Sequence, residues 1–267
     1  MAFKFLIADN YIFTDALDQL YNETIGKENV KGYRKNFDDV VISVVTERIR
    51  AINQDRYTYL YTPESYQLSK DMEKADAALS RIDELTPDTA YMILPNISKG
   101  TRSFVQSNRK TLSNYNNLIL DLRSNYGGFL ADFYRVAELF TERGTLLGHE
   151  NYRMPLISHA VKSGRGSYFD FEQIIILQDK NTASAAEGLI LALKSNLDNV
   201  TVIGETTFGK GIGQVTVPLL SGFAVKATIM LVSGPDNISI HRVGIEPDIP
   251  YTGENIIETA LNILDSD

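Results

Sequence analysis

The sequence predicts an α/β protein with a core of mostly parallel strands and helices, preceded by an N-terminal helical region. Short apolar runs alternate with helical patterns between residues 89 and 204. These runs contain few polar residues, which is typical of strands buried on both faces of a parallel sheet. The first seventy residues instead carry apolar side chains at helical spacing.

The N-terminal region is expected to hold two helices and a short strand. Apolar residues recur at helical spacing over Ile12–Tyr21 and again over Phe37–Ile49. Tyr57–Tyr61 alternates like a strand, and Pro63 is placed to begin a short helix. Asp71–Leu85 is polar and rich in alanine, so we expect a helix or a helical linker there.

Strands and helices alternate after a turn signal at residues 86–88. Strands are expected at Tyr91–Leu94, Asn117–Leu122, Thr145–His149, Ile174–Leu177, Val200–Ile203, Ile212–Leu219 and Phe223–Val232. Helices are expected at Arg102–Leu112, Phe129–Phe140, Ala185–Lys194 and Gly253–Leu264. The predicted organisation is therefore an N-terminal helical region (1–70), a linker (71–88), a core (89–252) and a C-terminal helix (253–267).

Composition and charge exclude several classes of protein. Of the 267 residues, 43% are hydrophobic and 22% charged, as in a globular protein with a substantial core. The net charge of −8 argues against a nucleic acid as the main partner. Cysteine is absent, and His149, His159 and His241 lack metal-ligand spacing, so we expect no metal site. No apolar run approaches the roughly 20 residues of a membrane span, and no signal peptide is visible.

A serine and a glutamate precede the helix expected at Ala185–Lys194. Ser184 and Glu187 have the spacing of a capping box, and the simpler interpretation is that Ser184 only caps the helix. The same position suits a nucleophile, because a helix N-terminus offers unpaired N–H groups and positive potential. An oxyanion formed by attack of Ser184 would lie beside the Ala185 N–H. The G-x-S-x-G elbow is absent, since Thr182 and Ala186 occupy its glycine positions.

A glycine-rich segment, Gly204–Gly211, nearly matches the phosphate-binding P-loop. Gly211 replaces the hydroxyl residue that binds Mg²⁺, and a strand pattern follows instead of a helix, so a nucleotide site is disfavoured. Lys210 is either an exposed loop lysine or, if desolvation lowers its pKa, a general base. Gln214 is spaced to hold the lysine amine, although alone it reads as an ordinary strand residue.

Two glycines, Gly127 and Gly128, follow the strand expected at Asn117–Leu122. Glycine lets the backbone approach a ligand closely or adopt a positive φ. On its own, this pattern is typical of a tight turn between a strand and a helix.

Taken together and in this order, the motifs resemble those of the C-terminal processing peptidases, the serine–lysine proteases of the S41 family. Four segments match its D-L-R-x-N-x-G-G, small-residue serine, G-E-x-T-F-G-K-G and G-I-E-P-D motifs: Asp121–Gly128, Thr182–Glu187, Gly204–Gly211 and Gly244–Asp248. The resemblance covers nearly all of residues 89–250 and, more weakly, residues 10–66.

The resemblance implies a fold of the ClpP/crotonase type and cleavage of peptide bonds through an acyl-enzyme. Ser184 would be the nucleophile, Lys210 the general base, and Gln214 the residue that orients the lysine. The N–H groups of Ala185 and Gly128 would form the oxyanion hole. The resemblance implies no cofactor. The partner would be a protein or peptide substrate cleaved in its tail.

One departure from the family concerns its PDZ domain, which usually precedes the core. Only 24 residues separate Tyr66 from Tyr91, fewer than the roughly 50 that a small domain needs. We therefore expect no PDZ domain. Without it, the chain would be an ungated protease, receive its substrate from a delivery or activator protein, or act on a different substrate. Family members mostly work outside the cytoplasm, which favours an extracytoplasmic location.

Two alternatives to the serine–lysine peptidase stay open. A catalytically silent member of the same fold would bind a peptide or an apolar ligand in the cleft, but the presence of Ser184, Lys210 and Gln214 favours the enzyme. A histidine-based variant would need His159 or His241 near Ser184.

Overall fold

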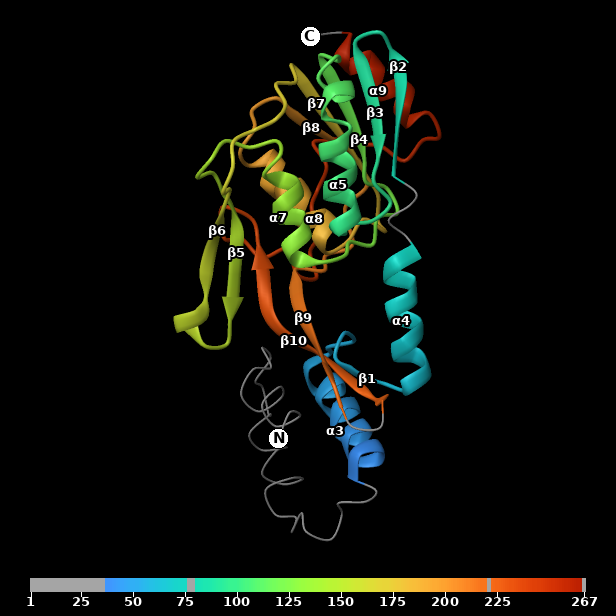
Figure 1. Ribbon diagram of the computed structural model, residues 1–267, viewed down its shortest axis with the longest axis vertical. Coiled ribbons are helices and arrows are strands. Elements are labelled where there is room, and N and C mark those ends of the chain that lie inside the picture. The colour runs from blue at the N-terminus through green and yellow to red at the C-terminus, as the bar shows by residue number, and fades with distance from the viewer. Residues whose placement is uncertain (1–36, 76–79, 220–221, 266–267) are drawn as a thin grey trace. The chain divides into compact units, whose positions relative to one another are not determined.

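The computed structural model describes residues 37–75, 80–219 and 222–265, which form two compact units (Figure 1). The first unit includes residues 37–73 together with Asn151–Ser158 and Ile212–Leu231. The second unit comprises Lys74–Glu150, His159–Gly211 and Val232–Asp267. The helix expected over Ile12–Tyr21 lies outside the described residues.

A six-stranded sheet forms the centre of the second unit, in the order β11-β8-β7-β4-β3-β2. All neighbouring strands are parallel except the antiparallel pair β2 and β3. Its strands are β2 (Arg81–Thr86), β3 (Thr89–Ile93), β4 (Asn117–Asp121), β7 (Gln173–Gln178), β8 (Val200–Gly204) and β11 (Ile249–Pro250). This sheet confirms the predicted α/β class with largely parallel strands.

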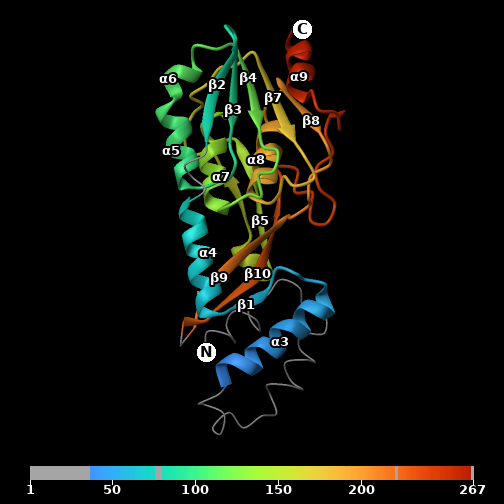
Figure 2. The same ribbon diagram turned by 90° about the vertical axis from the view of Figure 1, so that its right-hand side faces the viewer.

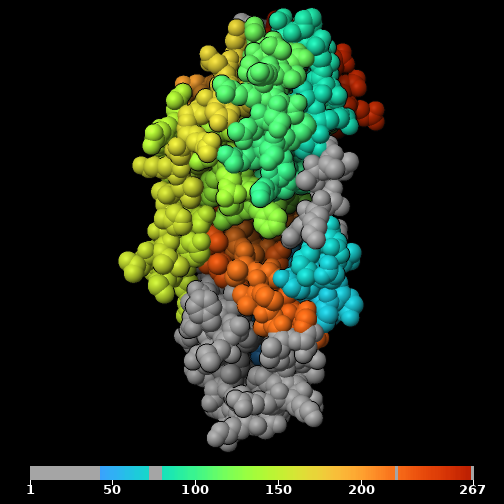
Figure 3. Space-filling model, viewed as in Figure 1, coloured from blue at the N-terminus to red at the C-terminus, as the bar shows by residue number. Residues whose placement is uncertain are grey.

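Helices cover both faces of this sheet (Figure 2). They are α5 (Lys99–Ser107), α6 (Arg109–Leu112), α7 (Leu130–Ala137), α8 (Ala185–Lys194) and α9 (Ile256–Leu264). Helices α5, α7 and α8 lie on one face, and α9 lies on the other. Leu118, Ile119 and Leu120 in β4 are all fully buried, which explains why the strand is apolar at successive positions. At the surface, the α5–α6 segment lies beside the chain after β6 (Figure 3), where the Arg109 guanidinium is 4.5 Å from the centre of the Tyr168 ring.

An antiparallel hairpin follows α7 and includes the strand expected at Thr145–His149. Its strands are β5 (Leu146–Tyr152) and β6 (His159–Lys162), which pair with a register shift between Leu146 and Gly148. A short 3₁₀-helix, Pro155–Ile157, lies between the two strands.

The first unit contains α3 (Phe37–Asn53), β1 (Tyr59–Tyr61), α4 (Pro63–Ala75), β9 (Ile212–Pro218) and most of β10 (Ala224–Ser233). Strand β10 pairs antiparallel with both β1 and β9. The Thr58 hydroxyl adds to this pairing by accepting a hydrogen bond from the Thr228 N–H at 3.0 Å. Residues 212–231, which the sequence assigned to the core, cluster with the N-terminal segment, where β10 pairs with β1.

The expected linker at residues 71–88 differs from the structure. Its helix, α4, ends at Ala75, and Arg81–Thr86 form the edge strand β2. Arg81, Asp83 and Glu84 are exposed, and charged side chains are typical of an edge strand. Residues 76–80 separate α4 from β2. Helix α9 packs on the sheet through Ile256 and Ala260, so it belongs to the second unit.

Candidate active site

The loop after β4 carries the two glycines and is shaped by the fully buried Asn125. Its side-chain Nδ2 donates to the Leu94 carbonyl at 2.7 Å, and its Oδ1 accepts from the Gly127 N–H at 2.8 Å. Its backbone carbonyl accepts from the Ala183 N–H at 2.9 Å. Asn125 thus fixes the glycine turn and joins it to the segment before α8. In the sequence, this asparagine is visible only as part of the motif Asp121–Gly128.

Ser184 lies at the N-terminus of α8 in an unusual backbone conformation. Its φ is 59° and its ψ is −119°, outside the extended region in which N-cap residues normally lie. A residue with a Cβ atom adopts such angles at a cost of about 1–3 kcal/mol, and such strain concentrates at functional sites. A sharp, strained turn into a helix is also how nucleophilic serines are presented in other hydrolase folds. The capping box of Ser184 and Glu187 is present as well, but capping a helix does not require this strained conformation.

The glycine turn lies directly against the Ser184 turn. A Cβ atom on Gly127 would lie 2.7 Å from the Ser184 Cβ and 2.8 Å from the Ala185 nitrogen. Gly128 forms a parallel bridge with Ile97, in which Ile97 donates to the Gly127 carbonyl and accepts from the Phe129 N–H. In that pattern the Gly128 N–H points away from Ile97. The first N–H groups of α8, including that of Ala185, have no acceptor within the helix.

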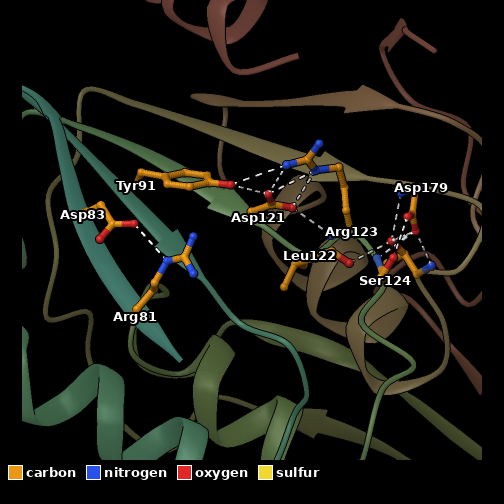
Figure 4. Close-up of polar contacts among 9 residues, drawn as sticks. Arg81, Asp83, Tyr91, Asp121, Leu122, Arg123, Ser124 and Asp179 are labelled. Atoms are coloured by element: carbon orange, nitrogen blue, oxygen red, sulfur yellow. Dashed lines mark hydrogen bonds and ion pairs between the residues drawn. The ribbon is translucent and has the colours of Figure 1, made fainter. Parts of the chain in front are cut away.

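Asp179 links the two turns from the end of β7 (Figure 4). Its carboxylate accepts from the Ser124 N–H at 2.9 Å and from the Asn181 and Thr182 N–H groups, both also at 2.9 Å. The Ser124 hydroxyl donates to it as well, at 3.1 Å. Partial desolvation raises the pKa of Asp179, but these hydrogen bonds outweigh that effect and hold the pKa below its usual range.

Glu187 is fully buried, and each of its two carboxylate oxygens accepts two hydrogen bonds. Oε1 accepts from the Thr207 hydroxyl at 2.6 Å and from the Gly209 N–H at 2.7 Å. Oε2 accepts from the Ser184 N–H at 2.7 Å and from the Lys210 N–H at 2.9 Å. Because these two nitrogens share one acceptor, they lie no more than about 6 Å apart. The structure thus brings the backbones of Ser184 and Lys210 together, which the spacing of Ser184 and Glu187 did not predict.

Gln214 lies in the first unit, on β9, where its Nε2 donates to the Tyr57 carbonyl at 2.5 Å. That Gln214 orients the Lys210 amine stays a prediction. Of the histidines, His149 Nε2 is 3.2 Å from the Pro235 carbonyl, and His159 pairs with Glu150 at 3.7 Å. The backbone of His241 lies close to Gly211, where a Cβ atom would be 2.8 Å from the His241 nitrogen.

Other motif residues have structural roles. The Tyr91 hydroxyl donates to Asp121 at 2.5 Å, and the Arg123 guanidinium pairs with the same carboxylate (Figure 4). Burial, followed by the hydrogen bond to Asp121, raises the pKa of Tyr91 to about 12. Asp248 accepts from the Val202 N–H at 2.9 Å and pairs with Lys194 at 2.5 Å.

Within the described ranges, no helix has the length and apolar character needed to cross a membrane. The same residues contain no group of three or more acidic or histidine side chains arranged to hold a metal ion.

Comparisons with known proteins identify the family of the chain. The family model of peptidase family S41 matches residues 88–251, more than half of the chain. The chloroplastic C-terminal processing peptidase of Tetradesmus obliquus is 30% identical over 188 residues, which cover 66% of this chain and 39% of that protein. The carboxyl-terminal-processing protease of Synechocystis sp. is 28% identical over 190 residues, covering 70% of this chain and 44% of that protein. The chain thus spans about two fifths of the length of these curated relatives.

Solved structures show the same fold. The photosystem II D1 C-terminal processing protease superposes with a TM-score of 0.55 at 26% identity, covering 67% of this chain and 47% of that one. A lipoprotein from Streptococcus agalactiae superposes with a TM-score of 0.71 at 20% identity, covering 97% and 92%, and shows the fold alone. The family match, these relatives and the shared fold together establish that the chain belongs to peptidase family S41.

Proposed function

We propose that this chain is a serine peptidase with Ser184 as nucleophile and Lys210 as general base. The observation that carries the proposal is the shared acceptor, Glu187 Oε2, which holds the backbone nitrogens of both residues within about 6 Å of each other. Lysine has a flexible four-carbon stem, which is long enough for an amine attached at that distance to reach a neighbouring hydroxyl.

The reaction follows from these groups. The neutral Lys210 amine takes the proton from the Ser184 hydroxyl as Oγ bonds to the carbon of the scissile carbonyl. The carbon–nitrogen bond then breaks, and the lysine ammonium gives its proton to the departing amine, leaving an ester on Ser184. Water attacks this ester with Lys210 again acting as base, which releases the carboxylic acid and restores the serine.

The negative charge on the substrate oxygen needs donors that are already in place. We assign this role to the N–H groups of Ala185, at the N-terminus of α8, and of Gly128, which points away from Ile97. Gly128 is exposed, as access to a substrate requires. Each donor of such a pair typically contributes about 10²–10³-fold to the rate.

The substrate in this proposal is the tail of a protein or peptide with apolar side chains. Tyr126 and Phe129 flank the two glycines and are exposed, as is Phe208, next to Gly209. Exposed apolar side chains around a reactive group favour apolar segments of a ligand. The role of Gln214 in orienting the lysine, a delivery or activator protein and an extracytoplasmic location also belong to the proposal and rest on the family resemblance.

Cleavage of unfolded casein and of apolar-tailed peptides, followed by mass spectrometry of the products, tests this function. We expect cleavage by the wild type and none by folded Ser184→Ala or Lys210→Ala. Ser103→Ala and Lys110→Ala, on exposed positions of α5 and α6, are matched controls that keep wild-type activity. If the wild type is folded and cuts nothing, the catalytically silent alternative replaces the proposal. If Lys210→Ala cuts normally, the base is another residue, and His241→Ala is the next variant to measure.

A further inference from the structure

We infer that Glu187 is a positioning residue whose carboxylate sets the location of the base relative to the nucleophile; this role rests on the proposed function. Glu187 does not need to touch the substrate to act. It is fully buried and contacts the backbone of both Ser184 and Lys210.

The hydrogen bonds of Glu187 converge from two separate segments of the chain. One segment is the turn into α8, from which Ser184 donates. The other is the loop after β8, from which Thr207, Gly209 and Lys210 donate at 2.6–2.9 Å. A single side chain thus ties the loop of the base to the helix of the nucleophile.

The chemistry of the donors requires a carboxylate at this position. Three of the four partners are backbone N–H groups, which donate and never accept. A carboxylate has acceptors on both oxygens, whereas an amide carries a donor on one side. In Glu187→Gln, the NH₂ group would replace one acceptor. On the Oε1 side it would leave the Gly209 N–H without an acceptor, and on the Oε2 side it would leave the Ser184 and Lys210 N–H groups without one. In either orientation, a hydrogen bond between Glu187 and the loop after β8 is lost in a buried setting.

The same bonds hold Ser184 in its positive-φ conformation. A residue with a Cβ atom leaves this conformation unless the surroundings hold it there. The Ser184 N–H reaches Glu187 Oε2 at 2.7 Å, so loss of the acceptor frees the turn. The backbone of Lys210 is likewise unable to withdraw from Ser184 unless the buried Oε2 loses a partner.

The test compares Glu187→Gln and Glu187→Asp with the wild type, using Asp132→Asn as a control that alters another buried carboxylate, on α7. Two readouts are needed: the kinetic constants for an apolar-tailed peptide, and amide hydrogen exchange of residues 182–187 and 205–211. For Glu187→Gln we expect kcat to fall at least about 100-fold with KM changed less than about 3-fold, because positioning is lost and binding is kept. Exchange should rise in both segments together. Glu187→Asp, which keeps the charge on a shorter side chain, should recover part of kcat.

Several outcomes overturn the inference. The inference is wrong if a folded Glu187→Gln variant keeps kcat within about 3-fold of wild type. It is also wrong if amide exchange rises in only one of the two segments. If Asp132→Asn loses as much kcat as Glu187→Gln, the loss reflects general destabilisation of the fold and the positioning role is wrong. If Glu187→Gln fails to fold, the decision passes to Glu187→Asp, and a folded Asp variant with wild-type kcat and exchange refutes the role. If the wild type cleaves nothing, the proposed function fails, and the exchange measurement still decides whether Glu187 joins the two segments.

Discussion

Replacing Gly127 with alanine perturbs the site at the contact between the glycine turn and the nucleophile turn. The added Cβ would lie 2.6 Å from the Ala183 carbonyl oxygen, 2.7 Å from the Ser184 Cβ and 2.8 Å from the Ala185 nitrogen. Two of these neighbours are backbone atoms, so relief requires the turn itself to move. The φ of +94° adds a conformational cost of about 1–2 kcal/mol for any residue with a Cβ atom.

Gly144 supplies a matched control for this substitution. Its φ of +87° carries a similar conformational cost, but an added Cβ would meet nothing within 4 Å. Gly144→Ala should therefore destabilise the fold by about 1–2 kcal/mol. Gly127→Ala should add about 1–3 kcal/mol for the forced contacts. Because a misplacement of about 1 Å at a reacting group costs about 100-fold in rate, we expect a large loss of peptidase activity only in Gly127→Ala.

Urea unfolding followed by circular dichroism gives the difference in free energy of unfolding between the two variants, and casein cleavage gives the rates. The reasoning is refuted if the two variants are equally stable and equally active. It is also refuted if Gly144→Ala loses as much activity as Gly127→Ala, since Gly144 lies against no part of the site.

Two further predictions concern the residues that hold the loops. Because the pKa of Asp179 is lowered by folding, its stabilising contribution is present above the unfolded-state value and is lost as the pH falls through the folded value. Wild-type stability should therefore decline below about pH 4, and urea unfolding should show a smaller decline for Asp179→Asn. Thr207→Val removes the donor to Glu187 and the acceptor of the Ile245 N–H. The Thr207→Val substitution should lower the free energy of unfolding by about 1–3 kcal/mol. It should also lower kcat, but by less than Glu187→Gln does. An unchanged free energy of unfolding would contradict the importance of these two hydrogen bonds.

Elements with strong local patterns were predictable. Helix α8 begins and ends where the sequence indicated, at Ala185 and Lys194, because an N-cap residue precedes the segment and its residues 189–193 are all apolar. The parallel core strands were predictable because burial on both faces leaves apolar side chains at successive positions. Strand β2 was missed because its charged, exposed residues carry no apolar alternation, and only its pairing with β3 makes it a strand.

The candidate reacting groups could be predicted from the sequence, but the hydrogen bonds that hold their loops in place could not. Sequence order placed Ser184 and Lys210 in separate loops, and the family resemblance alone joined them. Glu187 was visible only as one half of a capping box, because its bonds to Gly209 and Lys210 depend on tertiary contacts between distant segments. Asp179 carried a local signal that was overlooked, since aspartate often accepts hydrogen bonds from the N–H groups two and three residues later.

The most direct test of the central claim is the reaction of the folded protein with a fluorophosphonate, which phosphonylates activated serines, with the adduct located by peptide mass spectrometry. We expect a single adduct on Ser184, none in Ser184→Ala, and a rate at least about 100-fold lower in Lys210→Ala, since the base is then absent. An adduct on another serine, or an unchanged rate in Lys210→Ala, would contradict the assignment of nucleophile or base.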